Sequence, residues 1–285
     1  MDDTDSTRGP ALFDSGSGTT AAPVYRYQGG VLHEASEDDW LAQEMPLALE
    51  YNGISHATVL ATPCDLEDLA LGFSLTEGII RGPGDLHDLE LVQTKQGLIA
   101  QITIANACLA ELKQRRRTLA GRTGCGLCGL ESLDDVQRTL PPVDAPVNKL
   151  TPAAIVRGLQ NLKQRQPLHQ QTGATHAAAW ADRSGEILHL REDVGRHNAL
   201  DKLIGVMKHR RSEQDTADGF VMISSRASFE MVQKAASVGI PVVVAVSAPT
   251  HYAVQTANAL GVMLIGFARG PNFTVYSHPE YLSQT

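Results

Sequence analysis

The chain has 285 residues, 42% of them hydrophobic and 20% charged, which is enough to form a globular core without disulfide bonds. Its 24 basic and 32 acidic residues give a formal net charge of −8, unlike nucleic-acid binders that depend on bulk positive charge. The apolar runs are of strand length, the first residues lack the regions of a signal peptide, and four cysteines are too few for a disulfide scaffold. We therefore expect a soluble cytoplasmic protein with no nucleic-acid or membrane partner.

Residues 1–23 are rich in Gly, Ser, Thr and Asp and show no apolar period, which predicts a disordered tail. Alternating apolar residues on both sides of Asn52 and Gly53 predict a hairpin, because both residues tolerate the positive φ of a type I′ turn. A helix is expected after an N-cap at Asp65, and a second hairpin follows it. This order of elements predicts a small α+β domain over residues 24–146, which ends in a Cys-x-x-Cys loop and a proline-rich stretch.

From residue 147 to residue 285, strands and helices alternate. Thr151 and Pro152 are typical of the N-cap and the first position of a helix. The repeated β-α-β order and the runs of β-branched residues predict a mostly parallel sheet covered by helices, so the expected fold class is α/β. The expected strands cover residues 174–181, 187–190, 219–224, 240–246, 262–267 and 273–276, and the later helices cover residues 193–209, 229–238 and 252–260.

Two cysteines, Cys125 and Cys128, lie in a loop with glycines around and between them. A structural zinc site normally takes four Cys or His ligands, usually from two such pairs, and the chain has no second pair. A thioredoxin-like redox pair would be expected at the start of a helix. Arginines at 115–117 and 122 are often a solvated helix face, but their charge would also stabilise a thiolate. We favour a nucleophilic thiol, and the spacing leaves the zinc site open.

A second polar group surrounds the expected helix start at Asp193. Asp193 would cap the helix, and the free N–H groups of the first turn would form an anion site. Arg196, His197 and Asn198 come from that turn, with Asp201 one turn further along. Because apolar residues of this helix supply its buried stripe, we expect the polar residues to face a cleft or solvent.

Polar segments also follow several expected strands of the second domain. Ligands of open α/β sheets bind at the carboxyl ends of strands, where N–H groups of the following helices can face phosphates. Ser224 and Arg226 follow one buried strand, Ser247 follows the next, and residues 267–272 leave the last long one. Each serine alone is also typical of an ordinary N-cap. The chain has no P-loop and no G-x-G-x-x-G pattern, so it gives no support for ATP or NAD binding.

Five segments together resemble the FdhD family, the sulfur-carrier proteins required to make active formate dehydrogenase. The resemblance extends from about Tyr25 to about Tyr281, and the segments occur in the family's order. They are Gly124–Gly129, Glu192–Lys202, Ser225–Lys234, Gly239–Thr250 and Val275–Pro279.

The resemblance implies a persulfide mechanism. Proteins of this family take sulfur from an IscS-type cysteine desulfurase onto a loop cysteine, here Cys125, with Cys128 as a second candidate. They deliver it to the molybdenum of the bis(molybdopterin guanine dinucleotide) cofactor, a bound substrate, before insertion into formate dehydrogenase. The implied fold is a small α+β part joined to a cytidine-deaminase-like α/β domain, in a homodimer. The implied cofactor-binding residues are Phe267, Ala268, Arg269, Gly270, Pro271 and Asn272. The strand ends and the helix start described above add five candidate residues: Arg196, His197, Ser224, Arg226 and Ser247.

The sequence departs from the expected patterns in two places. Ala174 stands where the family's Thr-Gly-x-Thr-His loop leads us to expect glycine, and its methyl group would narrow a pocket there. Zinc-dependent deamination needs His-x-Glu followed by Pro-Cys-x-x-Cys, whereas this chain has His176 followed by two alanines, so deamination is not supported. With the FdhD-like function we expect no zinc. The rival functions are a non-catalytic chaperone that holds the cofactor for insertion into the apoenzyme, and a zinc-stabilised binding module.

Overall fold

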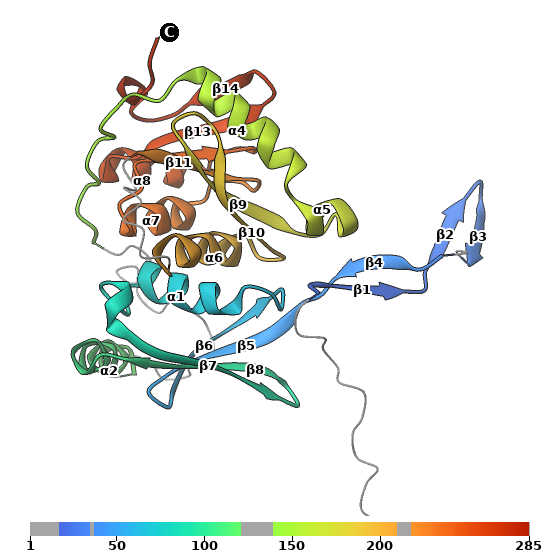
Figure 1. The fold of residues 1–285 in the computed structure, drawn as a ribbon, viewed down its shortest axis with the longest axis horizontal. Helices are drawn as coiled ribbons and strands as arrows, with labels where there is room; N and C mark the ends of the chain where they lie inside the picture. Colours follow the sequence, from blue (N-terminus) through green and yellow to red (C-terminus); the bar gives the residue numbers. More distant parts are fainter. Residues whose placement is uncertain (1–16, 35–36, 121–138, 210–217, 285) are drawn as a thin grey trace, which may run out of the picture.

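The computed structural model describes residues 17–34, 37–120, 139–209 and 218–284. They form a projecting arm (residues 17–42), an N-terminal lobe (residues 45–120) and a C-terminal lobe (residues 150–284), as Figure 1 shows. Among the described residues, no helix is long and apolar enough to cross a membrane.

The N-terminal lobe is a four-stranded sheet in the order β6-β5-β8-β7 with helices α1 and α2. Asn52 and Gly53 have φ values of 50° and 77°, which confirms the expected turn between β5 and β6. Asp65 is the N-cap residue of α1, as expected, but its φ is 52° and its side chain makes no cap hydrogen bond. The elements are β5 (Met45–Tyr51), β6 (Ile54–Ala61), α1 (Leu66–Thr76), a 3₁₀ turn (Pro83–Asp85), β7 (Leu86–Thr94), β8 (Gly97–Ile104) and α2 (Asn106–Ala120).

The C-terminal lobe is a six-stranded sheet in the order β10-β9-β11-β12-β13-β14, which confirms the α/β class. The sheet is mixed rather than mostly parallel, because only the β11–β12 and β12–β13 pairs are parallel. Short turns join β9 to β10 and β13 to β14, and such turns impose antiparallel pairing. The elements are α4 (Pro152–Gln164), α5 (Pro167–Thr172), β9 (His176–Asp182), β10 (Ile187–Asp193), α6 (Arg196–His209), β11 (Gly219–Ile223), α7 (Phe229–Ser237), β12 (Val242–Ala245), α8 (His251–Leu260), β13 (Met263–Arg269), β14 (Asn272–Val275) and a final 3₁₀ turn (Pro279–Tyr281).

Buried side chains cover both faces of this sheet, as expected for strands whose residues alternate between faces. Phe220 and Met222 of β11 pack in one cluster with the apolar face of α4. Val221 and Ile223 point the other way, into a larger cluster with α6 and α7. That larger cluster continues into the N-terminal lobe, so the two lobes share one hydrophobic core.

Helices α1 and α6 make the closest contact between the lobes. A methyl group at Gly72 would overlap the backbone carbonyl of Asp201, and one at Gly205 would overlap that of Asp68. Glycines on both helices therefore let the two backbones touch, which sets how the lobes sit on each other.

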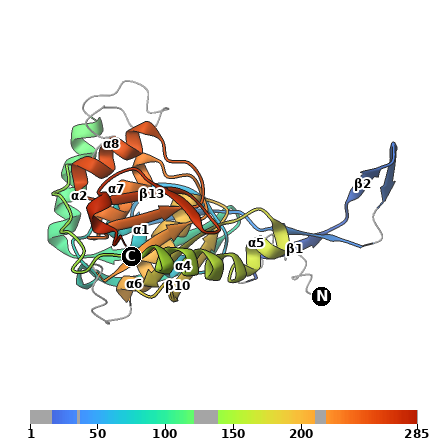
Figure 2. The same cartoon turned by 90° about the horizontal axis from the view of Figure 1, so that it is seen from above.

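The prediction of a disordered tail over residues 1–23 is wrong for its last residues. Residues 1–16 lie outside the described chain, but Thr19–Ala22 form strand β1, which pairs with β4 (Asp39–Ala42). Strands β2 (Tyr25–Gln28) and β3 (Val31–Glu34) form a hairpin beyond them. These four short strands make up the arm, which projects from the body in both views (Figures 1 and 2). Composition alone gave no sign of β1, because its sequence, Thr-Thr-Ala-Ala, has no apolar alternation.

Candidate functional site

One edge of the six-stranded sheet gathers the carboxyl ends of four strands. Strand β9 runs antiparallel to both β10 and β11, so β10 points the same way as β11, β12 and β13. Helices α6, α7 and α8 follow β10, β11 and β12, so their N-termini also lie at this edge. We call it the carboxyl edge; the start of β9 and the start of β14 belong to it as well.

The residues predicted from the strand ends and the helix start all lie at the carboxyl edge. Ser224 and Arg226 follow β11, and Ser247 follows β12. Arg196 and His197 open α6, while residues 267–272 end β13 and begin β14. The structure therefore brings these predicted positions to one edge; their role in binding stays a prediction.

Two of these serines tie neighbouring strand ends together. The Ser224 hydroxyl accepts a hydrogen bond from the Ala177 N–H at 2.9 Å, and the Ser224 N–H donates to the Ala177 carbonyl at 2.9 Å. The Ser247 carbonyl accepts from the Phe267 N–H at 3.1 Å. These bonds fix the β9, β11, β12 and β13 ends relative to one another, so the edge is a preorganised surface.

Phe267 has an unusual backbone conformation for a bulky residue. Its φ is 51°, and the β13–β14 register shifts between Gly266 and Arg269. A side chain at Gly266 would meet Pro249 Cδ at 2.6 Å, so the chain packs tightly there. The Phe267 ring is nevertheless 49% exposed. A strained, outward-facing aromatic ring is typical of a binding surface rather than of a core.

Three arginines lie at the carboxyl edge, although the protein as a whole is acidic. Arg269 Nε donates to the Val246 carbonyl at 3.3 Å, which leaves its terminal nitrogens available, and Arg226 is exposed. Arg196 Nε is buried and has no hydrogen-bond partner among the described residues. Arginines beside helix N-termini suit an anionic group such as a phosphate.

Two histidines lie beside these arginines. Burial lowers the pKa of His176, and the charges of Arg196 and His169 lower it further. Burial also lowers the pKa of His197, although Glu230 opposes this effect from a carboxylate oxygen 2.8 Å from Nε2. Both shifts favour neutral imidazoles at the edge, which can each donate and accept one hydrogen bond.

Other polar residues of α6 do not face a cleft or solvent, which corrects the expectation for this helix. Asn198, Asp201 and Lys202 are all buried. Lys202 Nζ lies 2.7 Å from Asp193 Oδ2 and donates to the Thr62 carbonyl at 3.0 Å. Asp193 ends β10 instead of capping the helix, which begins at Arg196. This burial is not predictable from the helix pattern, because polar residues usually occupy the outer face of a helix.

A second buried network joins the same helix to α1 and α7. Lys234 Nζ lies 2.9 Å from Asp201 Oδ2 and 2.8 Å from Glu77 Oε1. Thr76 Oγ1 also donates to Asp201 at 2.7 Å. Burial raises the pKa of Asp201, while the nearby Lys234 charge opposes the rise. These side chains therefore hold the two lobes together rather than lining the carboxyl edge.

Cys125 and Cys128 lie outside the described residues, so their placement is not part of the structure. The described chain resumes at residue 139, and the Val143 N–H donates to the Leu260 carbonyl at 2.8 Å. Leu260 ends α8 just before β13 begins, so this anchor lies at the edge opposite to the carboxyl edge. The position of the two cysteines relative to Arg269 therefore stays a prediction.

The two described cysteines are poor nucleophiles. Burial raises the pKa of Cys64, although Lys202 opposes the rise. Burial also raises the pKa of Cys108, and Asp85 adds to it. A raised thiol pKa means less thiolate at neutral pH. Among the described residues, no group of three or more His, Cys, Asp or Glu side chains is placed to hold a metal ion.

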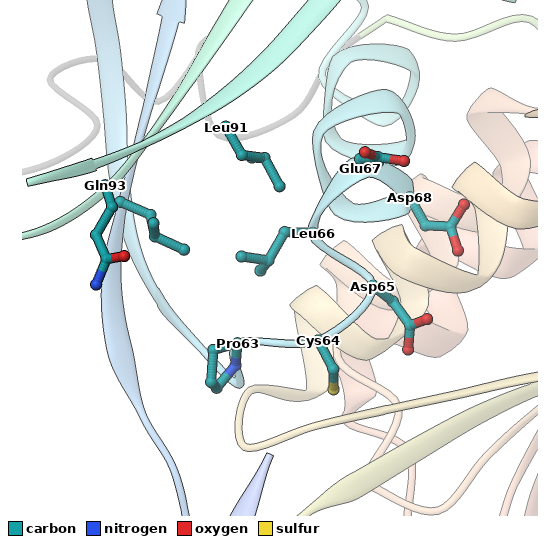
Figure 3. Close-up of a pocket in the computed structure, with 9 residues that line it drawn as sticks. Pro63, Cys64, Asp65, Leu66, Glu67, Asp68, Leu91 and Gln93 are labelled. Carbon is teal, nitrogen blue, oxygen red and sulfur yellow. The ribbon is translucent and has the colours of Figure 1, made fainter. Parts of the chain in front are cut away.

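Sequence reasoning missed a hollow of about 570 Å³ in the N-terminal lobe, shown in Figure 3. Leu66 and Leu91 line it from α1 and β7, and acidic side chains lie on its helix side. It contains none of the predicted binding residues. The signal in the sequence is weak, because its residues come from distant segments: Pro63, Cys64, Asp65, Leu66, Glu67, Asp68, Leu91, Gln93 and Leu98.

Known proteins that carry one name are similar to this chain over nearly its whole length. The chain is 54% identical over 262 residues to a Bordetella petrii protein named sulfur carrier protein FdhD, covering 92% of this chain and 93% of that protein. It is 53% identical to the protein of the same name from Bordetella bronchiseptica, covering 92% and 94%. A crystal structure from Desulfotalea psychrophila, assigned as a formate dehydrogenase accessory protein, has the same fold with a TM-score of 0.70. Its identity is 22%, over 93% of this chain and 99% of that one.

A family model gives the same assignment. The model of the FdhD/NarQ family matches residues 42–283, which includes both lobes and the whole carboxyl edge. With this match and relatives above 50% identity, the chain belongs to the FdhD/NarQ family.

Proposed function

We propose that this protein is a sulfur carrier that serves formate dehydrogenase. In this proposal Cys125 accepts persulfide sulfur from an IscS-type cysteine desulfurase and passes it to the molybdenum of the bis(molybdopterin guanine dinucleotide) cofactor. The protein acts in the cytoplasm as a homodimer. The observation that carries the proposal is the 54% identity, across both lobes, to a protein named sulfur carrier protein FdhD.

The chemistry of the cysteines supports a loop thiol as the carrier. The thiols of Cys64 and Cys108 are held protonated by burial. Cys125 has glycine neighbours and lies downstream of several arginines, which favour the thiolate. The thiolate attacks the outer sulfur of the desulfurase persulfide, forms a new S–S bond on Cys125, and leaves the desulfurase cysteine as a thiolate. Cys128 is the second candidate for this role.

The carboxyl edge supports the proposed cofactor site. Phosphates of a guanine dinucleotide suit Arg196, Arg226 and Arg269 beside the helix N-termini. The exposed Phe267 ring offers a flat apolar surface on which a guanine base can stack. His197 and the strand-end serines complete a polar rim at this edge.

Reconstitution of formate dehydrogenase with desulfurase, cysteine and Cys125→Ala protein tests the carrier role. We expect no activation of the dehydrogenase with this variant and normal GDP binding, with Cys64→Ala as the matched control that retains activation. A protein that only holds the cofactor would still activate the enzyme without Cys125, and that result would reject the proposal. Stoichiometric zinc in the purified protein would instead support a zinc-stabilised module.

Binding of GDP, a fragment of the cofactor, tests the proposed edge separately. We expect Arg269→Ala to bind GDP about tenfold or more weakly, because a charge-assisted contact to phosphate is lost. The control is Arg157→Ala. Arg157 is an exposed residue of α4, on the face of the sheet opposite to α6 and α7, and this variant should bind GDP as the parent does. Equal affinity of the parent and Arg269→Ala would remove Arg269 from the site.

A further inference from the structure

The arm is the part of the molecule that the proposed function leaves unused. It extends beyond both lobes in Figures 1 and 2 as two consecutive two-stranded ribbons. The family model begins at residue 42, where the arm ends, so the arm lies outside the family match.

The hairpin at the tip of the arm has one apolar face. In its register Tyr27 pairs with Leu32, and Tyr25 lies two residues before Tyr27 on the same strand, so the three share a face with Glu34, which pairs with Tyr25 at its end. Arg26 pairs with His33 and Gln28 with Val31 on the opposite face. The side chains of Tyr25, Tyr27 and Leu32 are 65%, 73% and 63% exposed.

An isolated ribbon with such a face gains little stability on its own. Two-stranded hairpins are marginal in water, and each large apolar side chain that becomes buried contributes about 1.5–3 kcal/mol. Here the neighbouring structure covers none of the three, since each is more than half exposed. An exposed apolar surface of this kind is typical of an interaction site.

The base of the arm lies beside the carboxyl edge. Gly18 at the start of the arm packs against Leu168 and Thr62. Thr62 donates its backbone N–H to Asp193 at 3.0 Å, and Asp193 is the last residue of β10. The base of the arm therefore lies next to the edge where the cofactor is proposed to bind, and the hairpin extends from this side of the molecule beyond β1 and β4.

Charge indicates the class of partner. The arm, residues 17–42, contains four acidic residues and one basic residue, a net charge of −3. Such a segment repels nucleic acids and anionic membranes and attracts basic protein surfaces.

We propose that the apolar face of the arm hairpin docks the enzyme that receives the sulfurated cofactor, on a patch of that enzyme with an apolar centre and Lys or Arg around it. This proposal rests on the proposed function, because it assigns the carboxyl edge to cofactor transfer. The arm then holds the acceptor next to that edge during the handover.

Binding of the full-length protein to purified apo-formate dehydrogenase tests the proposal by biolayer interferometry. Tyr25→Ser/Tyr27→Ser/Leu32→Ser should bind about tenfold or more weakly, since buried aromatic contacts dominate interfaces. The matched control Gln28→Ser/Val31→Ser/His33→Ser changes the opposite face and should bind as the parent does. Binding of the parent should weaken with salt. GDP binding and the thermal midpoint should be equal in all three proteins.

Two outcomes overturn the proposal. One is equal dehydrogenase binding by the apolar-face variant and the parent. The other is that the parent and the control variant form dimers and the apolar-face variant does not, while all three bind the dehydrogenase equally. In that case the apolar face would bind a second copy of this chain. The binding measurement involves no sulfur transfer. Failure of this proposal can therefore be told apart from failure of the carrier role, which is tested by reconstitution with Cys125→Ala.

Discussion

Lys202 and Asp193 form an ion pair in which both side chains are 0% exposed. Lys202 also donates to the Thr62 carbonyl, and Asp193 accepts from the Thr62 N–H, so the pair joins α6 to the segment that precedes α1. Asp193 also accepts from the Gly195 N–H at 2.8 Å and from Asn198 Nδ2 at 3.0 Å, so its charge is compensated by Lys202 and by hydrogen bonds. Buried charges of this kind are costly to leave unpaired.

Lys202→Met should lower the free energy of unfolding by about 3–5 kcal/mol, because it leaves the Asp193 carboxylate buried without its partner. Urea denaturation measures this change. Lys163→Met, at an exposed position of α4, is the control and should stay within about 0.5 kcal/mol of the parent. A loss below about 1 kcal/mol for Lys202→Met would show that water reaches the pair.

His176 should make the protein less stable in mild acid. Its pKa in the folded state is below the ordinary value of 6.5, chiefly because of burial and then because of Arg196. The unfolded chain therefore binds the proton at higher pH than the folded chain, so stability falls as pH drops through 6.5 toward the folded-state pKa. His176→Gln should lose less stability between about pH 7 and about pH 5 in thermal unfolding. An unchanged or steeper loss would contradict the assignment.

Among the elements, the β13–β14 bulge holds the backbone of Phe267 at a positive φ, which other residue types adopt more readily. Asparagine tolerates positive φ, so Phe267→Asn should raise stability by about 1 kcal/mol. The same change should weaken GDP binding about tenfold or more, because a stacking ring is lost. Thermal unfolding and GDP titration of one sample measure both effects. Unchanged GDP affinity would mean that the bulge serves packing alone.

The α1–α6 crossing should be intolerant of any side chain. In a helix interior, alanine is ordinarily about 1 kcal/mol more favourable than glycine. At Gly72 the added methyl group would overlap the Asp201 carbonyl, and backbone cannot move away cheaply. Gly72→Ala should therefore lower the free energy of unfolding by about 3 kcal/mol or more. Gly84→Ala, which has open space around it, is the control, and a neutral Gly72→Ala would contradict the direct contact between the two helix backbones.

On the scale of the whole molecule, the lobes act as one body built around a shared core. The large hydrophobic cluster runs from β5 and α1 through α6 and α7 to the sheet of the C-terminal lobe. The polar residues of the Glu192–Lys202 segment divide between two tasks. Asn198, Asp201 and Lys202 are buried at the lobe interface, whereas Arg196 and His197 remain at the carboxyl edge.

Local patterns were sufficient to predict much of this molecule. The hairpin at Asn52 and Gly53 was predictable because two residues determine the turn. The N-cap at Thr151 was predictable because its side chain bonds the Ala154 N–H three residues on. The carboxyl edge followed from the order of strands and helices, since that order fixes which strand ends meet.

Features that depend on distant contacts could not be predicted. The burial of Lys202 depends on Thr62, which is 140 residues away in the sequence. The arm is stabilised by pairing of short strands with weak propensity, such as Thr19–Ala22 with Asp39–Ala42. The antiparallel placement of β9 likewise depends on where a hairpin docks on the sheet, which local sequence does not encode.

The described residues on either side of the cysteine segment limit where Cys125 can lie. Cys125 is five residues from Ala120, the end of α2, and five extended residues reach at most about 17 Å. The other anchor, at Val143, lies at the edge opposite to Arg269. In the proposed transfer, Cys125 therefore has to reach the carboxyl edge from these two anchors.

The proposed function depends above all on Cys125 as the carrier of the transferred sulfur. Intact mass spectrometry of the protein after incubation with a cysteine desulfurase and cysteine, followed by peptide mapping under non-reducing conditions, tests it most directly. We expect one added sulfur atom, located on Cys125, and none in Cys125→Ala. Added sulfur on Cys64 or Cys108, or no added sulfur while formate dehydrogenase is still activated, would contradict it.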